Sequence, residues 1–412
     1  MSRIKHRFAA VGMFSTILLS NIMVGLVQSI DWKMPQLASQ ALPFGLADSI
    51  EGLPQFPFAL FLGMGIAGVI LAVFPLALSR TKILLVGLCV LGAATLLMAF
   101  VETPLALICL RLLSGIGWNM HFCAWVSLAS LRFPRHYGVV LGTLGFAIAV
   151  GGILGNEFAL ALYDAKGWYA RLFFVSTVGI PILLFSFLSI LHMFKRTSIA
   201  AGDDTFPPLF DDAASSCWSL RPMLLLVATI FLSLGAYAFQ GSFGTYLREI
   251  LSFPISTATS VMSLFVLSSL LSPLGGWLGD RLGFFNVLLM ALPLTGVIAG
   301  LLYMGWQMPL PILMLLMFLA SFALNALLLI SIFALILKSI VPEQNMRAIA
   351  LYSTALSFTA PFAHILFPYL QSRYGWQGAA LIQICGCLLL ANLLVWFVRQ
   401  SAASHGSGDV SV

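Results

Sequence analysis

The chain has 412 residues, of which 60% are hydrophobic and 8% are charged, and its mean hydropathy is +1.03. A soluble domain has about half apolar and about a quarter charged residues, so this composition excludes a soluble protein and predicts an integral membrane protein. The net charge of +6 does not indicate nucleic-acid binding, because the basic residues lie in short breaks between apolar runs and act there as topology signals.

Apolar runs of about 20 residues predict membrane-spanning helices rather than the alternating strands of a β-barrel. The first run follows Arg3, Lys5 and Arg7 without a convincing cleavage site, so we expect a retained helix rather than a signal peptide. We predict an all-α membrane protein with twelve transmembrane helices, at 8–34, 56–79, 83–101, 104–131, 137–163, 170–194, 221–247, 257–279, 284–304, 309–338, 346–371 and 376–399.

The longest polar stretch divides these helices into six and six. We expect an N-terminal six-helix bundle at 1–194, a cytoplasmic linker at 195–220, a C-terminal six-helix bundle at 221–400 and a disordered tail at 401–412.

The two halves repeat at an offset of 208 residues. FPR at 133–135 aligns with VPE at 341–343, and Gly167-Trp168 aligns with Gly375-Trp376. Parallel six-helix halves are one repeat architecture of secondary transporters, so the repeat agrees with the helix count.

The distribution of basic residues predicts that both termini are cytoplasmic. With that orientation the outer side receives only five cations, Lys33, Lys166, Arg171, Arg248 and Arg373, and Arg111 lies within the bilayer. The remaining 14 of the 20 Lys and Arg residues are then cytoplasmic.

The short loop after the eighth predicted helix reads GGWLGDRLGFF, at 275–285. It resembles the signature G-x-L-x-D-R-x-G-[RK]-[RK] of the major facilitator superfamily. The matching positions are Gly276, Leu278, Asp280, Arg281 and Gly283, while Phe284 and Phe285 replace the basic pair. The resemblance implies a latch that pins this loop to a neighbouring helix in one conformation and releases it in the other. The alternative is a solvated turn with a topology-setting Arg.

The corresponding first-half loop, PLALSRTK at 75–82, has Arg80 at the position of the signature's Arg. Ser79 stands where the Asp is expected, and the later glycine is missing. We assign Arg80 to the latch, although this half of the signature is incomplete.

Arg111 begins the stretch RLLSGIGWN, which resembles the R-x-x-x-G-x-G pattern of the superfamily's fourth helix. An Arg inside the bilayer requires a partner or a water-filled cavity. Asp31, near the outer end of the first helix, is the natural partner, and some proton-coupled drug antiporters of the superfamily carry an acid at a similar place. We predict that both residues serve proton coupling. Alternatively, Arg111 caps backbone carbonyls and Asp31 is an interfacial acid beside Lys33.

The fifth predicted helix partly matches an antiporter pattern through Gly142, Gly151 and Gly155, although Asn156 replaces its proline. Small residues also simply allow helices to approach closely. Glu157, next in the chain, is a second candidate proton carrier. The alternative is an acid that reaches water at the outer interface.

Neutral polar residues within the spans are candidate substrate contacts. Asn119 and His121 are two residues apart, so they point about 200° from each other and cannot both face one cavity. Asn21 and Gln28 are seven apart and share one helix face. The second half contributes Tyr237, Gln240 and Asn325, and His364 is the last candidate for proton coupling.

These features predict a secondary transporter that moves a small organic solute by alternating access. The sequence has no GxxxxGK[ST] motif, so we expect a proton gradient rather than ATP as the energy source, with no cofactor and no metal site. The six cysteines do not have metal-site spacing.

We expect the protein to act as a monomer that exports its solute across the cell's inner (plasma) membrane, driven by protons. A proton-linked importer of a small, anionic metabolite is the alternative. A non-transporting receptor on the same fold would not need buried titratable groups. An enzyme is not expected, because no nucleophile-base pair stands at helical spacing.

Overall fold

The computed structural model describes residues 18–22, 24–26, 55–74, 79–98, 100, 103–133, 136–166 and 216–406. In this part of the chain the regular structure is helical and contains no strand. Seven of the described helices are long and apolar enough to cross a membrane, and eight if one bent pair is counted as a single span. The all-helical membrane fold is therefore confirmed, whereas twelve helices and their orientation remain predictions.

The chain divides into two compact units. The described residues of Met1–Ala129 and Phe146–Asp211 form the first unit, and those of Ser130–Gly145 and Asp212–Val412 form the second. The first turns of α6 (Tyr137–Lys166) therefore belong with the C-terminal helices.

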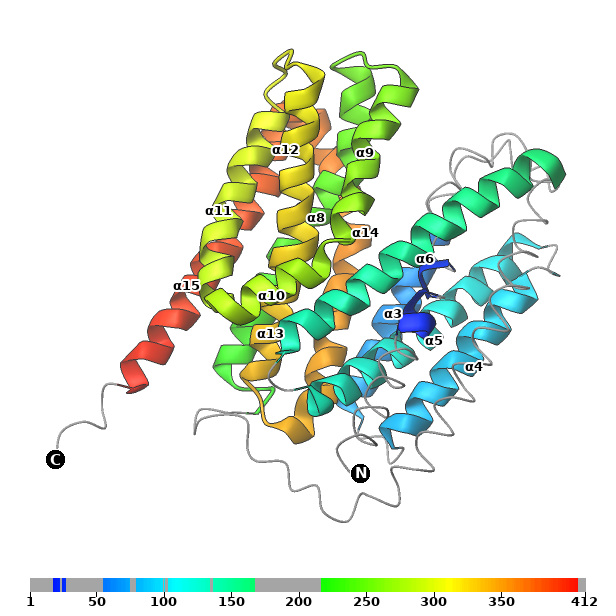
Figure 1. Ribbon diagram of the computed structural model, residues 1–412, viewed down its shortest axis with the longest axis vertical. Coiled ribbons are helices and arrows are strands. Elements are labelled where there is room, and N and C mark those ends of the chain that lie inside the picture. The colour runs from blue at the N-terminus through cyan, green and yellow to red at the C-terminus, as the bar shows by residue number, and fades with distance from the viewer. Residues whose placement is uncertain are drawn as a thin grey trace, which may run out of the picture. The chain divides into compact units, whose positions relative to one another are not determined.

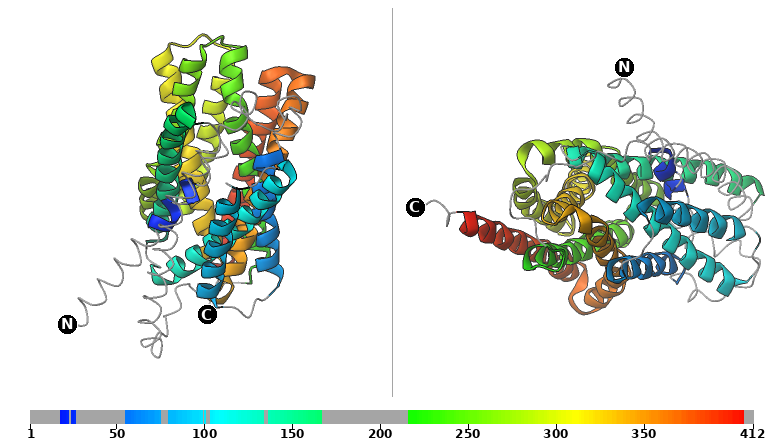
Figure 2. Two further views of the ribbon diagram at one scale, coloured as in Figure 1. Left: turned by 90° about the vertical axis from the view of Figure 1, so that its right-hand side faces the viewer. Right: turned by 90° about the horizontal axis from the view of Figure 1, so that it is seen from below.

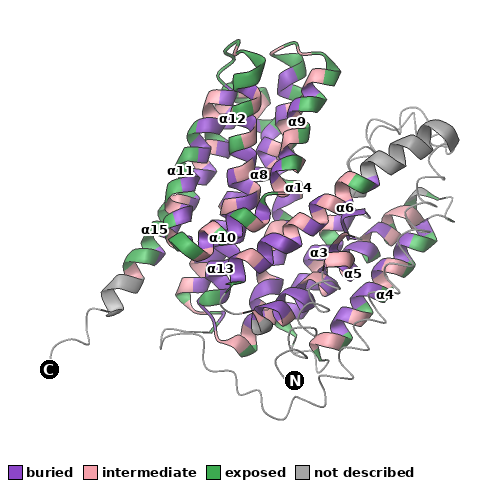
Figure 3. Ribbon diagram, viewed as in Figure 1, coloured by how far each residue is buried: buried purple, intermediate pink, exposed green. Residues whose placement is uncertain are grey.

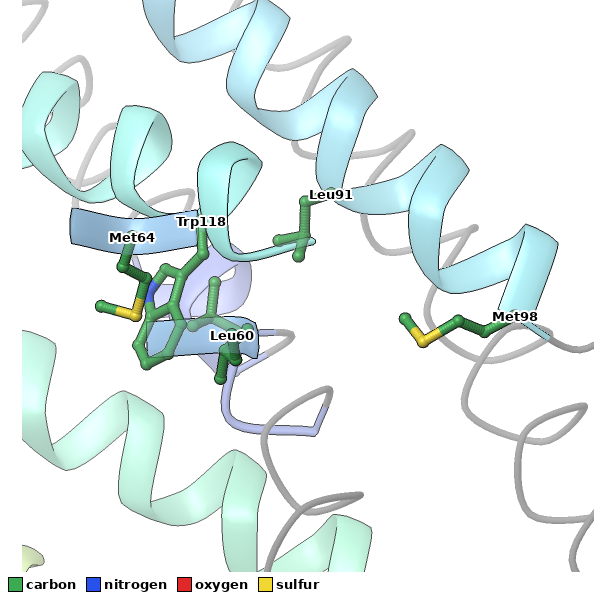
Figure 4. Close-up of a cluster of buried hydrophobic side chains, with 6 residues drawn as sticks. Leu60, Met64, Leu91, Met98 and Trp118 are labelled. Carbon is green, nitrogen blue, oxygen red and sulfur yellow. The ribbon is translucent and has the colours of Figure 1, made fainter. Parts of the chain in front are cut away.

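The first unit contains α3 (Gln55–Val73), α4 (Arg80–Met98), most of α5 (Pro104–Arg132) and the rest of α6. Its core includes Trp118 of α5, which packs against Leu60 and Met64 of α3 (Figure 4). Glycines bring the backbones of these helices into contact: a Cβ on Gly115 would collide with the Leu60 carbonyl, and one on Gly63 with the Leu112 carbonyl.

The helices of the second unit lie side by side (Figures 1 and 2). They are α8 (Leu220–Glu249), α9 (Ile255–Ser269), α10 (Ser272–Leu282), α11 (Phe284–Leu302), α12 (Leu310–Phe322), α13 (Leu329–Lys338), α14 (Asn345–Ala379) and α15 (Cys387–Gly406). Two π-helical segments interrupt them, η4 (Ala323–Leu328) and η6 (Ala380–Gly386).

Prolines mark several of these helix starts, where a missing N–H costs no intrahelical bond. Pro254 and Pro309 immediately precede α9 and α12. The exposed faces of the helices include large apolar side chains, such as Met290, Leu294 and Val297 on α11. Figure 3 shows exposed segments along this helix. Such faces are typical of helices surrounded by lipid.

The 208-residue repeat is visible in the helix bounds. Adding 208 to the bounds of α6, 137 and 166, gives 345 and 374. The helix α14 starts at Asn345, and its helical backbone breaks at Gly375, where φ is +70°. The helix α6 and the part of α14 before Gly375 thus have equal length and matching ends.

Candidate functional site

The Asp280 carboxylate caps the first turn of α6. Its Oδ1 accepts a hydrogen bond from the backbone N–H of Gly138 at 3.0 Å, and its Oδ2 accepts one from Val139 at 3.1 Å. The first N–H groups of a helix have no intrahelical partner and form the positive end of its dipole. A carboxylate from α10 therefore holds the N-terminus of α6 through two charge-assisted bonds.

Glycines on both helices permit this approach. A Cβ on Gly276 of α10 would collide with the Gly138 carbonyl, and one on Gly142 would collide with the Ser272 carbonyl. At these positions only glycine fits, because backbone meets backbone. We call Asp280, Gly276, Gly138 and Val139 the α10–α6 latch.

Arg281 takes a different role from Asp280. Its guanidinium lies over the ring of Trp277, with 5.3 Å to the centroid. The two aromatic residues that replace the signature's basic pair are themselves covered by cations: Lys338 lies 4.6 Å from the centroid of Phe284, and Arg221 lies 5.9 Å from that of Phe285. Cation–π contacts thus stand where the superfamily has basic side chains.

Gly283 lies between α10 and α11 with φ +86°, a positive value that favours glycine. This turn allows α11 to start directly after α10. Arg80, the first-half candidate, is the first residue of α4 in the other unit. The preceding Ser79 caps α4 by accepting a bond from the Lys82 N–H at 3.4 Å.

The fourth-helix candidates lie on α5 in the first unit. Arg111, Asn119 and His121 are each 0% exposed. Asn119 donates to the Met64 carbonyl at 2.7 Å and so joins α5 to α3. His121 lies edge-on to Trp125, and its ring nitrogens have no hydrogen-bond partner among the described residues. Asn119 and His121 have separate surroundings, as their spacing predicts.

Several first-half candidates cannot be placed in this way. Asp31 and Gln28 lie outside the described residues, and Glu157 lies in α6 with its side chain outside them. Asn21 is 1% exposed. The glycine pattern of the fifth helix provides close packing at Gly151, where a Cβ would collide with the Ile22 carbonyl.

In the second unit His364 of α14 lies against α8. Its Nδ1 is 2.8 Å from the Ala360 carbonyl, and a Cβ on Gly241 would stand 2.6 Å from its Nε2. Tyr237 is one turn before Gly241 on the same face of α8, and Gln240 is the residue next to it. These three candidates therefore lie near one another.

Asn325 is separate from that group. Its Nδ2 donates to the Phe265 carbonyl of α9 at 3.1 Å and lies 3.4 Å from Ser268 Oγ. Among the residues whose side chains are described, no group of three or more His, Cys, Asp and Glu could hold a metal ion.

Residues 225–410 match the family model of the Major Facilitator Superfamily. The whole chain also resembles solved structures. The structure of a bacterial homologue of the iron transporter ferroportin, in an outward-facing state, is 16% identical with a TM-score of 0.72, over 94% of this chain and 99% of that chain. The fold is that of a major facilitator superfamily transporter.

Two further major facilitator structures agree. The transporter FucP in its outward conformation is 14% identical with a TM-score of 0.68, over 93% of this chain and 98% of that chain. The human organic anion transporter MFSD10 is 16% identical with a TM-score of 0.69, over 93% of this chain and 99% of that chain. The resemblance noted in the sequence is confirmed, and the protein is a multi-pass membrane protein.

The partners of the major facilitator signature were not predicted. The Gly138 and Val139 N–H groups belong to the backbone, which leaves no side-chain signal in the sequence. Tyr137 and its repeat equivalent Asn345 meet at Ser130. The Asn345 amide donates to Ser130 Oγ at 3.3 Å, and the Tyr137 hydroxyl is hydrogen bonded to Ser130 and Asn345. The start of the fifth helix and the start of α14 thus lie together within the second unit.

Proposed function

We propose that this protein is a proton-coupled secondary transporter that exports a small organic solute by alternating access. We further propose that it is a monomer in the inner (plasma) membrane. Its twelve spans would form two six-helix bundles, with both termini in the cytoplasm. The observation that carries it is the Asp280 carboxylate on the N-terminus of α6. A transporter of this type needs contacts that form in one conformation and break in the other.

The latch has the chemistry of a reversible contact. In it, one carboxylate accepts two hydrogen bonds from the N–H groups of one helix end. Charge-assisted hydrogen bonds contribute about 1.5–3 kcal/mol each. A difference of this size shifts a two-state population by about one to two decades, since about 1.4 kcal/mol corresponds to a factor of ten. Two of the similar structures are outward-facing, and we assign the closed latch to that state here.

The energy source is proposed to be a proton gradient, with Asp31, Glu157 and Arg111 in the first half as the coupling residues. Export is favoured by the partial antiporter pattern around Gly142 and Gly151. Import of an anionic metabolite is the second candidate, since Arg111 is a fully buried cation on α5 and the similar human structure is an organic anion transporter.

Asp280→Asn tests the proposal without a known substrate. The variant keeps the shape of the side chain but loses its charge and one acceptor, so amide hydrogen exchange at Gly138 and Val139 should rise about tenfold or more. Glu343→Gln, at an exposed acid of the same unit, is the matched control. Unchanged exchange in a folded Asp280→Asn protein would remove the latch from the proposal.

Transport can be measured directly once a substrate has been found, by screening ligands for thermal stabilisation of the purified protein. In reconstituted vesicles, an imposed pH gradient should drive the solute against its concentration gradient, and Asp280→Asn should slow this movement. A transport rate that does not depend on the pH gradient would refute proton coupling. The direction in which the solute moves distinguishes export from import.

A further inference from the structure

The helix that carries the latch is bent. The axes of α9 and α10 differ by 50° across Leu270 and Leu271. Pro273 explains the break, because it has no N–H to donate to the Ser269 carbonyl four residues back. Instead, the Leu270 and Leu271 N–H groups bond to carbonyls only three residues back. The eighth predicted span, expected as one helix at 257–279, is therefore two helices joined at a hinge.

One side chain from another helix holds the first arm of this hinge. Asn325 lies in η4, where an extra residue in the turn lets the Leu329 N–H bond five residues back, to Leu324. Its amide donates to the Phe265 carbonyl in the last turn of α9 and lies within 3.4 Å of Ser268 Oγ. Such single-turn π segments often occur at functional sites.

The adjacent residue of η4 holds the second arm. A Cβ on Gly275 of α10 would collide with the Ala326 carbonyl, so α10 lies directly on the π segment. The next residue of α10, Gly276, points about 100° further around the helix, and there it contacts Gly138 of α6. Asp280 lies one helical turn beyond Gly276, and it bonds the α6 N-terminus.

We propose that Asn325 is a positioning residue of the α10–α6 latch: it fixes the angle between α9 and α10 and thereby places the Asp280 carboxylate on the N-terminus of α6. This inference rests on the proposed function of the latch and extends it to the residue that aims it. Asn325 acts through the hinge and does not contact Asp280, Gly138 or Val139 itself.

The role differs from the substrate contact that the sequence suggests for Asn325. In the present structure its amide is bound to the backbone of its own unit, at the one place where α9 changes direction. A small rotation at Leu270 is carried along α10 to Asp280, whose two bonds each need an oxygen close to an N–H group. The geometry of a distant hydrogen bond therefore depends on the hinge angle.

A double-mutant cycle tests this inference. Amide hydrogen exchange at Gly138 and Val139 is measured for the full chain in wild type, Asn325→Leu, Asp280→Asn and the double variant. Asn325→Leu keeps the side-chain size but cannot donate. Ser263→Ala is the control, because the Ser263 hydroxyl is exposed and bonds within its own helix, to the Ser260 carbonyl at 2.7 Å.

We expect Asn325→Leu to raise exchange at the two amides about fivefold to tenfold and to add nothing in the Asp280→Asn background. Ser263→Ala should match wild type. Equal fold-changes with and without Asp280 would overturn the inference, because they mean that Asn325 acts independently of the latch. A rise that extends equally over 284–302 would also overturn it, since that is general loosening of the unit.

Pro273→Ala changes the angle between α9 and α10 in a second way. The substitution restores an N–H, so the hinge can straighten while Asn325 and Asp280 remain in place, and exchange at Gly138 and Val139 should again rise. If Asp280→Asn raises exchange but neither hinge variant does, the latch stands and the positioning role is wrong. If Asp280→Asn itself has no effect, both ideas fail together.

Discussion

Gly276 and Gly138 meet backbone to backbone, and a Cβ on either residue would collide with the carbonyl group of the other. Two helices from opposite halves of the sequence approach here as closely as polypeptide chains can. Since neither position has space for a methyl group, the closed latch should be sensitive to the smallest possible side chain.

Gly276→Ala should therefore destabilise the second unit by about 1–3 kcal/mol, the usual effect of overpacking. The measurement is the thermal unfolding midpoint of the purified protein, with amide exchange at Val139 as a local readout. Gly296→Ala on α11 is the control, because its nearest neighbouring atom would be 3.9 Å from the new Cβ. A Gly276→Ala protein as stable as the control would contradict the close packing.

Proton coupling is predicted to depend on the first half. Asp31→Asn or Glu157→Gln, at whichever site is the carrier, should abolish uphill, pH-driven transport and leave substrate exchange measurable. A neutral side chain lets the protein change conformation but cannot bring a proton. The assay is vesicles with an imposed pH gradient. If both variants still accumulate substrate, the proton site is elsewhere and His364 is the next residue to test.

The contact between His364 and Gly241 predicts a substrate effect in the second unit. Gly241→Ala would place a methyl group 2.6 Å from Nε2 and force the imidazole away. Because His364 lies beside the candidate substrate contacts Tyr237 and Gln240, ligand affinity, measured by thermal stabilisation, should fall about tenfold, an effect of the size expected for one lost hydrogen bond. Gly244→Ala is the control, since its nearest contact would be 3.5 Å, to Met262 Cγ. Gly241→Ala should change nothing further in a His364→Ala background, and an additional loss there would show that His364 is not the residue concerned.

Cys217, at the end of the predicted linker, should be a slow nucleophile. It is 0% exposed, and burial raises the pKa of its thiol, although the Arg347 charge acts in the opposite direction. Since only the thiolate reacts, alkylation should be slow at neutral pH and should keep rising with pH beyond about 8.5, where a free thiol levels off.

The environment of Cys217 depends on Gln344, whose Oε1 accepts the Cys217 N–H at 2.8 Å. Gln344→Ala should therefore speed alkylation by loosening the segment. A cysteine at the exposed Ser216, in a Cys217→Ala background, provides the rate of an accessible thiol. If Cys217 of the wild-type protein reacted as fast as the thiol of this control variant, Cys217 would be open to solvent and the prediction would be wrong.

Apolar runs predicted the helices well because burial in lipid requires their length and composition. The predicted span 137–163 compares with α6 at 137–166, and 309–338 compares with the run from α12 to α13. The break in the eighth span was not predicted, although Pro273 was a visible signal for it. Apolarity continues through the bend, so hydropathy alone cannot find it.

The sequence predicted that Asp280 contacts a neighbouring helix, but it did not predict the partner atoms. The superfamily signature identified Asp280, yet its partners are backbone N–H groups whose position depends on how α6 packs. The guanidinium of Arg281 stacks on the ring of Trp277. The spacing of residues in the sequence does not show which neighbour such a side chain contacts. Asn325 was predicted from polarity alone, which does not reveal whether a half-buried amide binds a ligand or a backbone carbonyl.

A single residue, Gly375, separates the long helix that starts at Asn345 from the helical run that ends at Gly406. Its φ of +70° turns the chain within an exposed polar stretch that includes Ser372, Arg373 and Gln377, and both arms pack against α8. The two arms are expected to enter the bilayer together as a preformed hairpin, so a side chain at Gly375 should act on biogenesis, lowering the amount of protein that reaches the membrane.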